Sequence, residues 1–338
     1  MAHKGQKRMV QHEISGLRTA PSGVIGGRIR GSLLGLAVGD ALGTTVEFKP
    51  RGSFAPLTDI VGGGPFGLKA GEWTDDTSMA LCLAESIVET RSFNPTDQLA
   101  RYVRWYKDGH LSSNGRCFDI GGQTRAALMQ FQATGRAECG FAGEEYSGNG
   151  SLMRLSPVAM AFYRQPTVAI DLAGKSSLTT HGSRLCVDAC RYLAALLLGA
   201  FAGIGKSRLL AEEFTPVRGL WLEAPLHPQI AAIARGSWKN KPETTIRTSG
   251  FVVHTLEAAL WAFANTESYE QAVLRAVNLG EDADTTGAVC GQLAGAFYGA
   301  GGIPQRWLDI LAGRGTVEML AEKLIAFAHS RGSPGADG

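Results

Sequence analysis

The stretch GEWTDDTSMALCLAESIVET, Gly71–Thr90, decides the fold that we expect for this chain. Its apolar residues, among them Met79, Leu83 and Ile87, recur at steps of three and four, which favours a helix over a strand. The same spacing continues along nearly the whole chain, with no alternation of strand and helix patterns. We therefore expect an all-α fold. Its helices are predicted at 27–42, 77–90, 95–108, 121–134, 154–164, 183–203, 251–265, 268–279, 286–299 and 316–331.

The composition is that of an ordinary globular protein, because 44% of the 338 residues are hydrophobic and 19% are charged. No low-complexity linker interrupts the helical patterns, so we expect one compact domain over residues 25–330. The polar, glycine-bearing ends are interpreted as an N-terminal extension, 1–24, and a C-terminal tail, 331–338.

Charge and hydropathy argue against several classes of partner. With 33 basic against 31 acidic residues the net charge is +2, so nothing indicates a nucleic acid or a membrane surface as a partner. The most apolar stretch, 192–204, is shorter than the roughly 18 residues of a membrane span. The first 25 residues lack a signal-peptide core, and the six cysteines show no CxxC spacing. We expect reduced thiols and a cytoplasmic protein.

Two adjacent acids, Asp75 and Asp76, stand between threonines where the helical pattern of 77–90 begins. A helix cap contributes about 1 kcal/mol, and an acid in the first turn contributes about 0.3–1 kcal/mol. Taken alone, this turn is explained by Thr74 or Asp75 as the cap, with Asp76 adding a favourable charge to the helix start.

A second cluster changes that interpretation. The segment LGEDADTTGAVCGQLAGAFYGA, 279–300, again places acids and threonines before a helix rich in small residues. Neither cluster has a Lys or Arg within its turn, and unpaired carboxylates brought together repel one another unless a cation lies between them. Carboxylate and hydroxyl oxygens suit Mg²⁺, Ca²⁺ or Mn²⁺, whereas Zn²⁺ prefers the His and Cys that both clusters lack.

We expect a metal site that is split between the two clusters. A single EF-hand is excluded, because position 12 of a loop starting at Asp282 is Leu293 where Glu is needed. Two divalent ions close together orient a polyol or phosphate and activate water, which indicates metal-assisted hydrolysis. Glu47 ends the segment GLAVGDALGTTVEF and is either a solvated residue after a glycine-lined helix or a general base.

Together these residues resemble the ADP-ribosylglycohydrolase family, whose bacterial archetype removes ADP-ribose from dinitrogenase reductase. The matching segments lie at 31–48, 71–89, 115–128, 148–160, 180–200 and 278–299. The resemblance implies a compact all-α fold with two Mg²⁺ ions per chain at its centre, or Mn²⁺ in their place. Asp284 is the bridging ligand by this resemblance, and Glu47 matches a mobile glutamate that approaches the metals or orients water. The implied metal ligands are Thr74, Asp75, Asp76, Asp282, Asp284 and Thr285.

The resemblance also implies a substrate. Family members place the 2′- and 3′-hydroxyls of the proximal ribose of ADP-ribose on the metals, which fixes the anomeric carbon for attack. A glycine-containing loop cradles the diphosphate and distal ribose, since glycines let backbone N–H groups approach anionic oxygens. The alternative is that the sequence GNG at 148–150 forms an ordinary turn. The loop positions implied here are Gly148, Asn149, Gly150, Ser151 and Met153.

Two further residues match functional positions of the family, and each also has a structural explanation. His181 occupies the position of a family histidine beside the nucleotide, although a single histidine before an apolar helix also caps or packs. Asp119 matches an acid near the leaving group of arginine-directed members, where a carboxylate engages guanidinium. The alternative for Asp119 is a cap on the helix that starts near Gly121.

The function expected from these residues is hydrolysis of the bond between ADP-ribose and an arginine side chain of a modified protein. Its catalytic residues are expected to be Glu47, Asp284 and Asp119. One alternative is a hydrolase of serine-linked or small-molecule ADP-ribose. Another is an antidote that occludes an ADP-ribosylating toxin through residues 1–24. A third is a structural role, in which the acids bind ions that hold the fold together without turnover.

Overall fold

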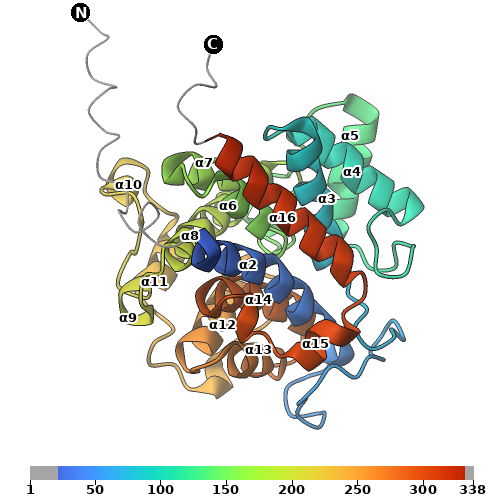
Figure 1. The fold of residues 1–338 in the computed structure, drawn as a ribbon, viewed down its shortest axis with the longest axis vertical. Helices are drawn as coiled ribbons and strands as arrows, with labels where there is room; N and C mark the ends of the chain where they lie inside the picture. Colours follow the sequence, from blue (N-terminus) through green and yellow to red (C-terminus); the bar gives the residue numbers. More distant parts are fainter. Residues whose placement is uncertain (1–21, 332–338) are drawn as a thin grey trace, which may run out of the picture.

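The computed structural model describes residues 22–331, which form helices joined by turns (Figure 1). This part of the chain contains no strand and only three isolated β-bridges, so the all-α prediction is confirmed. The α-helices are α2 (Ser22–Gly43), α3 (Asp75–Thr90), α4 (Pro95–Asp108), α5 (Gly122–Thr134), α6 (Ser156–Phe162), α7 (Pro166–Leu178), α8 (Arg184–Phe201), α9 (Lys206–Leu209), α10 (Leu220–Glu223), α11 (Pro228–Ala234), α12 (Val252–Ala264), α13 (Tyr269–Val277), α14 (Ala283–Tyr298), α15 (Gln305–Ile310) and α16 (Arg314–Ser330).

Helices α2 and α14 lie side by side in the middle of the molecule (Figure 1). They run in opposite directions, because Gly31 packs on Gly295 while Gly43 packs on Ala283. Glycines recur at every fourth position on the facing sides, and a Cβ added at any of them would overlap backbone atoms of the other helix. The two backbones therefore touch without side chains between them. The glycines are Gly31, Gly35, Gly39 and Gly43 on α2 and Gly287, Gly291 and Gly295 on α14.

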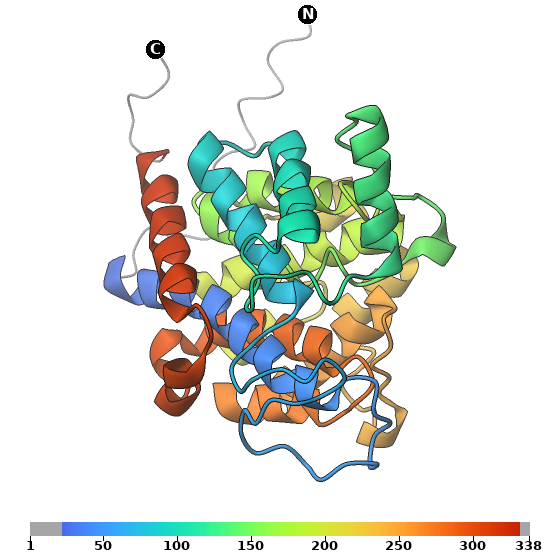
Figure 2. The same cartoon turned by 90° about the vertical axis from the view of Figure 1, so that its right-hand side faces the viewer.

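This contact brings the end of α2 to the start of α14. The backbone of Gly43 touches that of Asp284, and the chain after α2 continues through a 3₁₀ turn, Thr44–Val46, alongside the loop before α14. There Phe48 donates its backbone N–H to the carbonyl of Glu281 at 2.7 Å, and Glu281 donates to the carbonyl of Lys49 at 2.8 Å. The remainder of the long connector to α3 forms loops on one side of the molecule (Figure 2).

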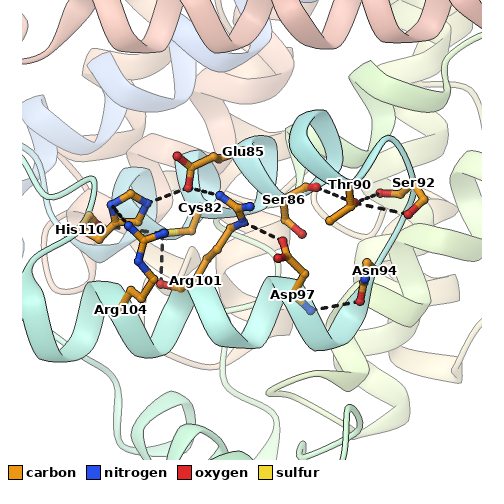
Figure 3. Close-up of polar contacts among 10 residues, drawn as sticks. All are labelled: Cys82, Glu85, Ser86, Thr90, Ser92, Asn94, Asp97, Arg101, Arg104 and His110. Atoms are coloured by element: carbon orange, nitrogen blue, oxygen red, sulfur yellow. Dashed lines mark hydrogen bonds and ion pairs between the residues drawn. The ribbon is translucent and has the colours of Figure 1, made fainter.

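Helix α3 is tied to α4 by an ion-pair network shown in Figure 3. Glu85 on α3 pairs with Arg101 on α4 and with His110 just beyond α4, whose ring nitrogen lies 2.7 Å away. Arg101 also reaches Asp97 at 2.6 Å, and the Asn94 side chain caps α4 by accepting from the Asp97 backbone at 3.1 Å. Glu85 is ten residues beyond the start of α3, about 15 Å along a helix. The network therefore fixes α3 without touching the acids of its first turn.

Most helices lie where the apolar spacing predicts them, but α7 was not predicted. It begins at Pro166, which is well tolerated at the first helical position but resembles a helix breaker in a sequence. Its interior also contains Gly174, which packs closely on Val187 and Arg191 of α8. A small residue at the packing face thus weakens the apolar pattern by which a helix is recognised. The short helices α9, α10, α11 and α15 also lie outside the predicted ranges.

Residues 1–21 and 332–338, which make up most of the expected extension and tail, lie outside the described residues. Helix α2 begins at Ser22, so 22–24 are helical and do not belong to a polar extension. Nearly all buried apolar side chains of the described part form one connected cluster. No helix in this part has the length and apolarity needed to cross a bilayer.

Gly39→Ala is expected to lower the free energy of unfolding by about 1–3 kcal/mol, because its methyl group would meet the backbone of Gly287 and Ala288, which cannot rotate away. Gly26→Ala in the same helix meets no atom within 4 Å, so its better helix propensity should raise that free energy by about 0.5–1 kcal/mol. Urea unfolding followed by circular dichroism measures both. Similar effects of the two variants would show that the backbones do not touch.

Candidate active site

The two acid–threonine clusters meet where the first turns of α3 and α14 face each other. The Thr74 hydroxyl lies 3.3 Å from Asp284 Oδ2, and the Thr285 hydroxyl lies 3.4 Å from Asp76 Oδ2. One carboxylate oxygen from each of Asp40, Asp76 and Asp284 lies within 4.8 Å of the other two. Residues more than 200 positions apart thus share one small, buried volume.

Asp40, which the sequence analysis did not select, organises this turn. It stands on α2 directly after Gly39 and is fully buried. Its Oδ1 accepts hydrogen bonds from the backbone and hydroxyl of Thr74, both at 2.9 Å, and its Oδ2 accepts those of Thr77 at 3.0 and 2.6 Å. Asp40 therefore caps α3 from another helix. An acid inside an apolar, glycine-lined helix was the signal that could have identified it.

The hydrogen bond to Asp40 also determines what the Thr74 hydroxyl presents to the cluster. A hydroxyl has one proton, and the shorter contact, 2.9 Å to Asp40, takes it. The contacts of the same oxygen with Asp76 and Asp284 are longer, at 3.3 Å each. Thr74 consequently directs a lone pair toward two carboxylates, an arrangement that suits a cation between the ionised oxygens.

The electrostatics of the cluster support the same conclusion. Burial, followed by repulsion from the neighbouring carboxylates, raises the pKa of Asp75, Asp76 and Asp284 well above the ordinary range. Within residues 22–331 no Lys, Arg or His forms an ion pair with any acid of the site, and no donor reaches Asp76 Oδ1. Oxygen-only donors of this kind fit a hard divalent cation.

Glu47 and Asp119 form a second group with Asp284, with oxygens within 4.8 Å of one another. Glu47 is 5% exposed, which rules out the alternative of a solvated residue after the helix. Burial, together with the charge of Asp284, raises the pKa of Glu47 strongly, and its Oε2 has no partner among the described residues. Burial raises the pKa of Asp119 to about 6, with smaller contributions from Asp40 and Asp282.

A cavity of about 680 Å³ opens above these acids. Its size lies within the range of about 300–1,000 Å³ typical of small-molecule sites. Thr74, Asp76 and Ser151 do not line the cavity. The Ser151 hydroxyl instead lies 2.8 Å from that of Ser177 in the core. The predicted site residues that line the cavity are Glu47, Asp75, Asp119, Gly148, Asn149, Gly150, Met153, His181, Asp282, Asp284 and Thr285.

Asn149 links the glycine-containing loop to the acid cluster. Its amide nitrogen donates to Asp282 Oδ2 at 2.7 Å and to the Thr255 hydroxyl at 2.8 Å. The neighbouring Gly148 N–H donates to Gln123 Oε1 at 2.9 Å and so is already occupied. The side chain of Asn149 therefore orients a candidate metal ligand. Sequence reasoning missed this role and that of Gln123, because both depend on partners distant in the chain.

His181 is held in one tautomer by a buried chain of hydrogen bonds. Arg154, which can only donate, gives a proton to the Thr180 hydroxyl at 2.7 Å. The Thr180 oxygen lies 2.8 Å from His181 Nδ1, the only acceptor found for its own proton in the described part of the chain. Nδ1 is therefore the acceptor, and Nε2 carries the hydrogen.

The Nε2–H group of His181 faces the cavity. A Cβ added at Gly150 would lie 3.1 Å from this nitrogen, so the glycine leaves the ring edge uncovered. Burial, with the positive charge of Arg154, lowers the pKa of His181 to about 3. The ring is consequently a neutral hydrogen-bond donor at physiological pH, rather than a cation or a general acid.

Removing divalent ions is expected to make stability strongly dependent on pH. A carboxyl whose folded pKa is raised stabilises the fold while it is protonated, and this contribution is lost as pH rises through the folded pKa. In chelator the protein should melt at a lower temperature at about pH 8 than at about pH 5.5, and saturating Mg²⁺ should restore more at about pH 8. Asp284→Asn removes one repelling charge and should flatten the dependence in chelator. Parallel curves for the two proteins would contradict the electrostatic account.

Thr180→Val should release His181 from its tautomer, because Val can neither accept from Arg154 nor donate to Nδ1. In ¹⁵N spectra of the native protein the His181 ring should show protonated Nε2 and bare Nδ1, unchanged between pH 5 and 8. The Thr180→Val ring should show a mixture of tautomers. Thr179→Val is the matched control, since Thr179 also accepts from Arg154 but does not touch the ring. An unchanged ring in Thr180→Val would refute the hydrogen-bond chain.

Curated relatives match most of the length of this chain. The chain is 41% identical to the ADP-ribosylarginine hydrolase Tri1 of Serratia proteamaculans, over 89% of this chain and 80% of that protein. It is 43% identical to the protein of the same name from Pseudomonas putida, over 88% and 78%. A third relative, the ADP-ribosyl-dinitrogen reductase glycohydrolase of Rhodospirillum rubrum, is 30% identical over 87% and 92%.

Comparison of folds agrees with comparison of sequences. A solved structure described as an ADP-ribosylglycohydrolase-related protein complex superposes with a TM-score of 0.79 at 44% identity, covering 90% of this chain and 99% of that one. The ADP-ribosylglycohydrolase family signature matches residues 22–334. The protein belongs to the ADP-ribosylglycohydrolase family.

Proposed function

We propose that this protein hydrolyses the N-glycosidic bond between ADP-ribose and an arginine side chain of a modified protein. The observation that carries the proposal is the floor of the cavity, where Glu47, Asp119 and Asp284 converge beneath about 680 Å³ of space. Two relatives that are 41% and 43% identical are named ADP-ribosylarginine hydrolases, which supports arginine as the linkage.

The metal centre of this proposal is a pair of Mg²⁺ ions, or Mn²⁺ in their place. The residues that would hold them are Thr74, Asp75, Asp76, Asp282, Asp284 and Thr285. When bound, such ions supply positive charge to substrate oxygens and lower the pKa of a coordinated water. The unpartnered Asp76 Oδ1 and the lone pair of Thr74 support this assignment, because both need a positive partner.

In the proposed reaction a water molecule attacks the anomeric carbon of the proximal ribose. The C–O bond forms, the C–N bond to the guanidine breaks, and the water proton moves to the Glu47 carboxylate before reaching the departing guanidine. Positive charge nearby must first favour the ionised form of Glu47, whose pKa is raised by burial. Asp119, with a pKa of about 6, is ionised at neutral pH and pairs with the leaving guanidinium.

Beside Gly148 and Gly150, His181 contributes a neutral Nε2–H donor to the cavity. We assign it to an oxygen of the diphosphate, because a phosphate oxygen accepts such a hydrogen bond and neutral imidazole donates no proton outright. Asn149 acts indirectly by orienting Asp282.

The antidote hypothesis rests on residues 1–24, of which 1–21 lie outside the described residues, so toxin binding stays a prediction. The cytoplasmic location likewise stays a prediction. It is consistent with the six cysteines, all of which lie in the described part of the chain as free thiols.

The decisive experiment compares release of ADP-ribose from arginine-linked and serine-linked peptides in Mg²⁺. Glu47→Gln is expected to reduce release from arginine by about 10²–10⁴-fold, because the proton acceptor is lost. Glu89→Gln, in the same protein but on an exposed pair with Lys323, should leave the rate unchanged. Chromatography of free ADP-ribose measures each rate. Faster release from serine would replace the substrate assignment, and no release from either peptide would sink the hydrolase proposal.

A further inference from the structure

Three phenylalanines from separate loops form a connected cluster, and one of them lines the cavity. Phe48 follows the turn after α2, Phe66 lies in the connector before α3, and Phe118 precedes Asp119. The ring centroids of Phe48 and Phe66 are 6.4 Å apart, and those of Phe66 and Phe118 are 5.3 Å apart. Phe48 itself lines the cavity, so we refer to Phe48, Phe66 and Phe118 as the aromatic wall.

Phe48 occupies a position that stability alone does not explain. Its side chain is 67% exposed, and its φ of 61° lies in the left-handed region that a bulky residue rarely adopts. The hydrogen bond from its N–H to Glu281 holds this conformation, and Glu281 is itself left-handed with a φ of 55°. Strained residues of this kind persist where the surrounding framework determines them, often beside a functional group. Here Glu47 and Asp282 are the adjacent residues.

The charged side chains that line the cavity have a single sign. Acidic residues line it, whereas no Lys or Arg of residues 22–331 does, and His181 is kept neutral. Asp119 directly follows Phe118 and lies on the cavity surface behind the wall. The faces of aromatic rings and a carboxylate both attract a cation, but from different directions. A planar cation can therefore stack on a ring through its face and bond the carboxylate through its edge. The acids that line the cavity are Glu47, Asp75, Asp119, Glu281, Asp282 and Asp284.

We infer that the aromatic wall is the subsite for the guanidinium of the substrate arginine, with Phe48 as its contact ring, and that it selects arginine-linked over serine-linked ADP-ribose. This inference rests on the proposed function, because it names the part of the same cavity that reads the linkage. Serine-linked ADP-ribose presents no cation and gains nothing from the ring. The guanidinium gains the contact both before and during bond cleavage, so the wall acts mainly on substrate binding.

The test separates the π face of the ring from its bulk. Phe48→Leu keeps an apolar side chain without a π face and should raise KM for arginine-linked peptide about two- to fivefold, the range expected of one exposed cation–π contact. Phe48→Tyr keeps the π face and should restore the native KM. Neither variant should change KM for a serine-linked peptide or the affinity for free ADP-ribose. Leu222→Ala, at an exposed apolar residue outside the cavity, is the control for general surface effects.

A second measurement does not require turnover. Ethylguanidinium should bind the native protein and Phe48→Tyr more tightly than Phe48→Leu, whereas its neutral isostere ethylurea should not distinguish the three proteins. An equal KM rise for both linkages, or ethylguanidinium binding that ignores Phe48→Leu, would overturn the aromatic subsite. If the native protein released no ADP-ribose from arginine, the proposed function would fail, while the ethylguanidinium comparison would still decide whether the wall binds a cation.

Discussion

The contact between the backbones of α2 and α14 is the constraint on which the rest of the structure depends. Because glycine faces glycine along both helices, no side chain separates them, and the start of α14 lies against the end of α2. That proximity places Asp284 within 4.8 Å of oxygens from Asp40 and Asp76 in one group and from Glu47 and Asp119 in the other. A larger residue in the interface would move one helix by more than these distances tolerate.

The acids of the site oppose folding, and the fold contains specific interactions that offset this cost. Bringing carboxylates together in a buried volume raises their pKa values and leaves the ionised site in need of a cation. Four hydrogen bonds converge on Asp40 and fix the turn of α3 whether or not a cation is bound. At its other end, α3 is fixed by the pairs of Glu85 with α4 and His110. Carboxylates are thus brought close together at a position where a bound cation can neutralise their repulsion.

Much of this arrangement could be predicted because its signals are local. These signals lie within single helices or turns: the TDDT and DADTT turns, the glycines at every fourth position, and the apolar residues at steps of three and four. The roles of Asn149 and Ser151 could not be predicted in the same way. Asn149 bonds a residue 133 positions away, and Ser151 faces a core serine instead of the cavity. Which side of a tight turn a residue faces is set by tertiary packing, which one sequence does not encode locally.

The polarity of the cavity explains why neutral and charged groups are distributed as they are. Its charged side chains are all acids, so an anionic diphosphate is tolerated only if positive charge comes from bound cations and if nearby donors add no competing acid. His181 meets the second condition, because Arg154 and Thr180 keep it neutral with its N–H toward the cavity. The acids that line the cavity, together with exposed Phe48 on its surface, then favour a substrate whose other end is cationic. The same negative charge thus favours metal ions beside the clustered acids and a guanidinium group beside Phe48.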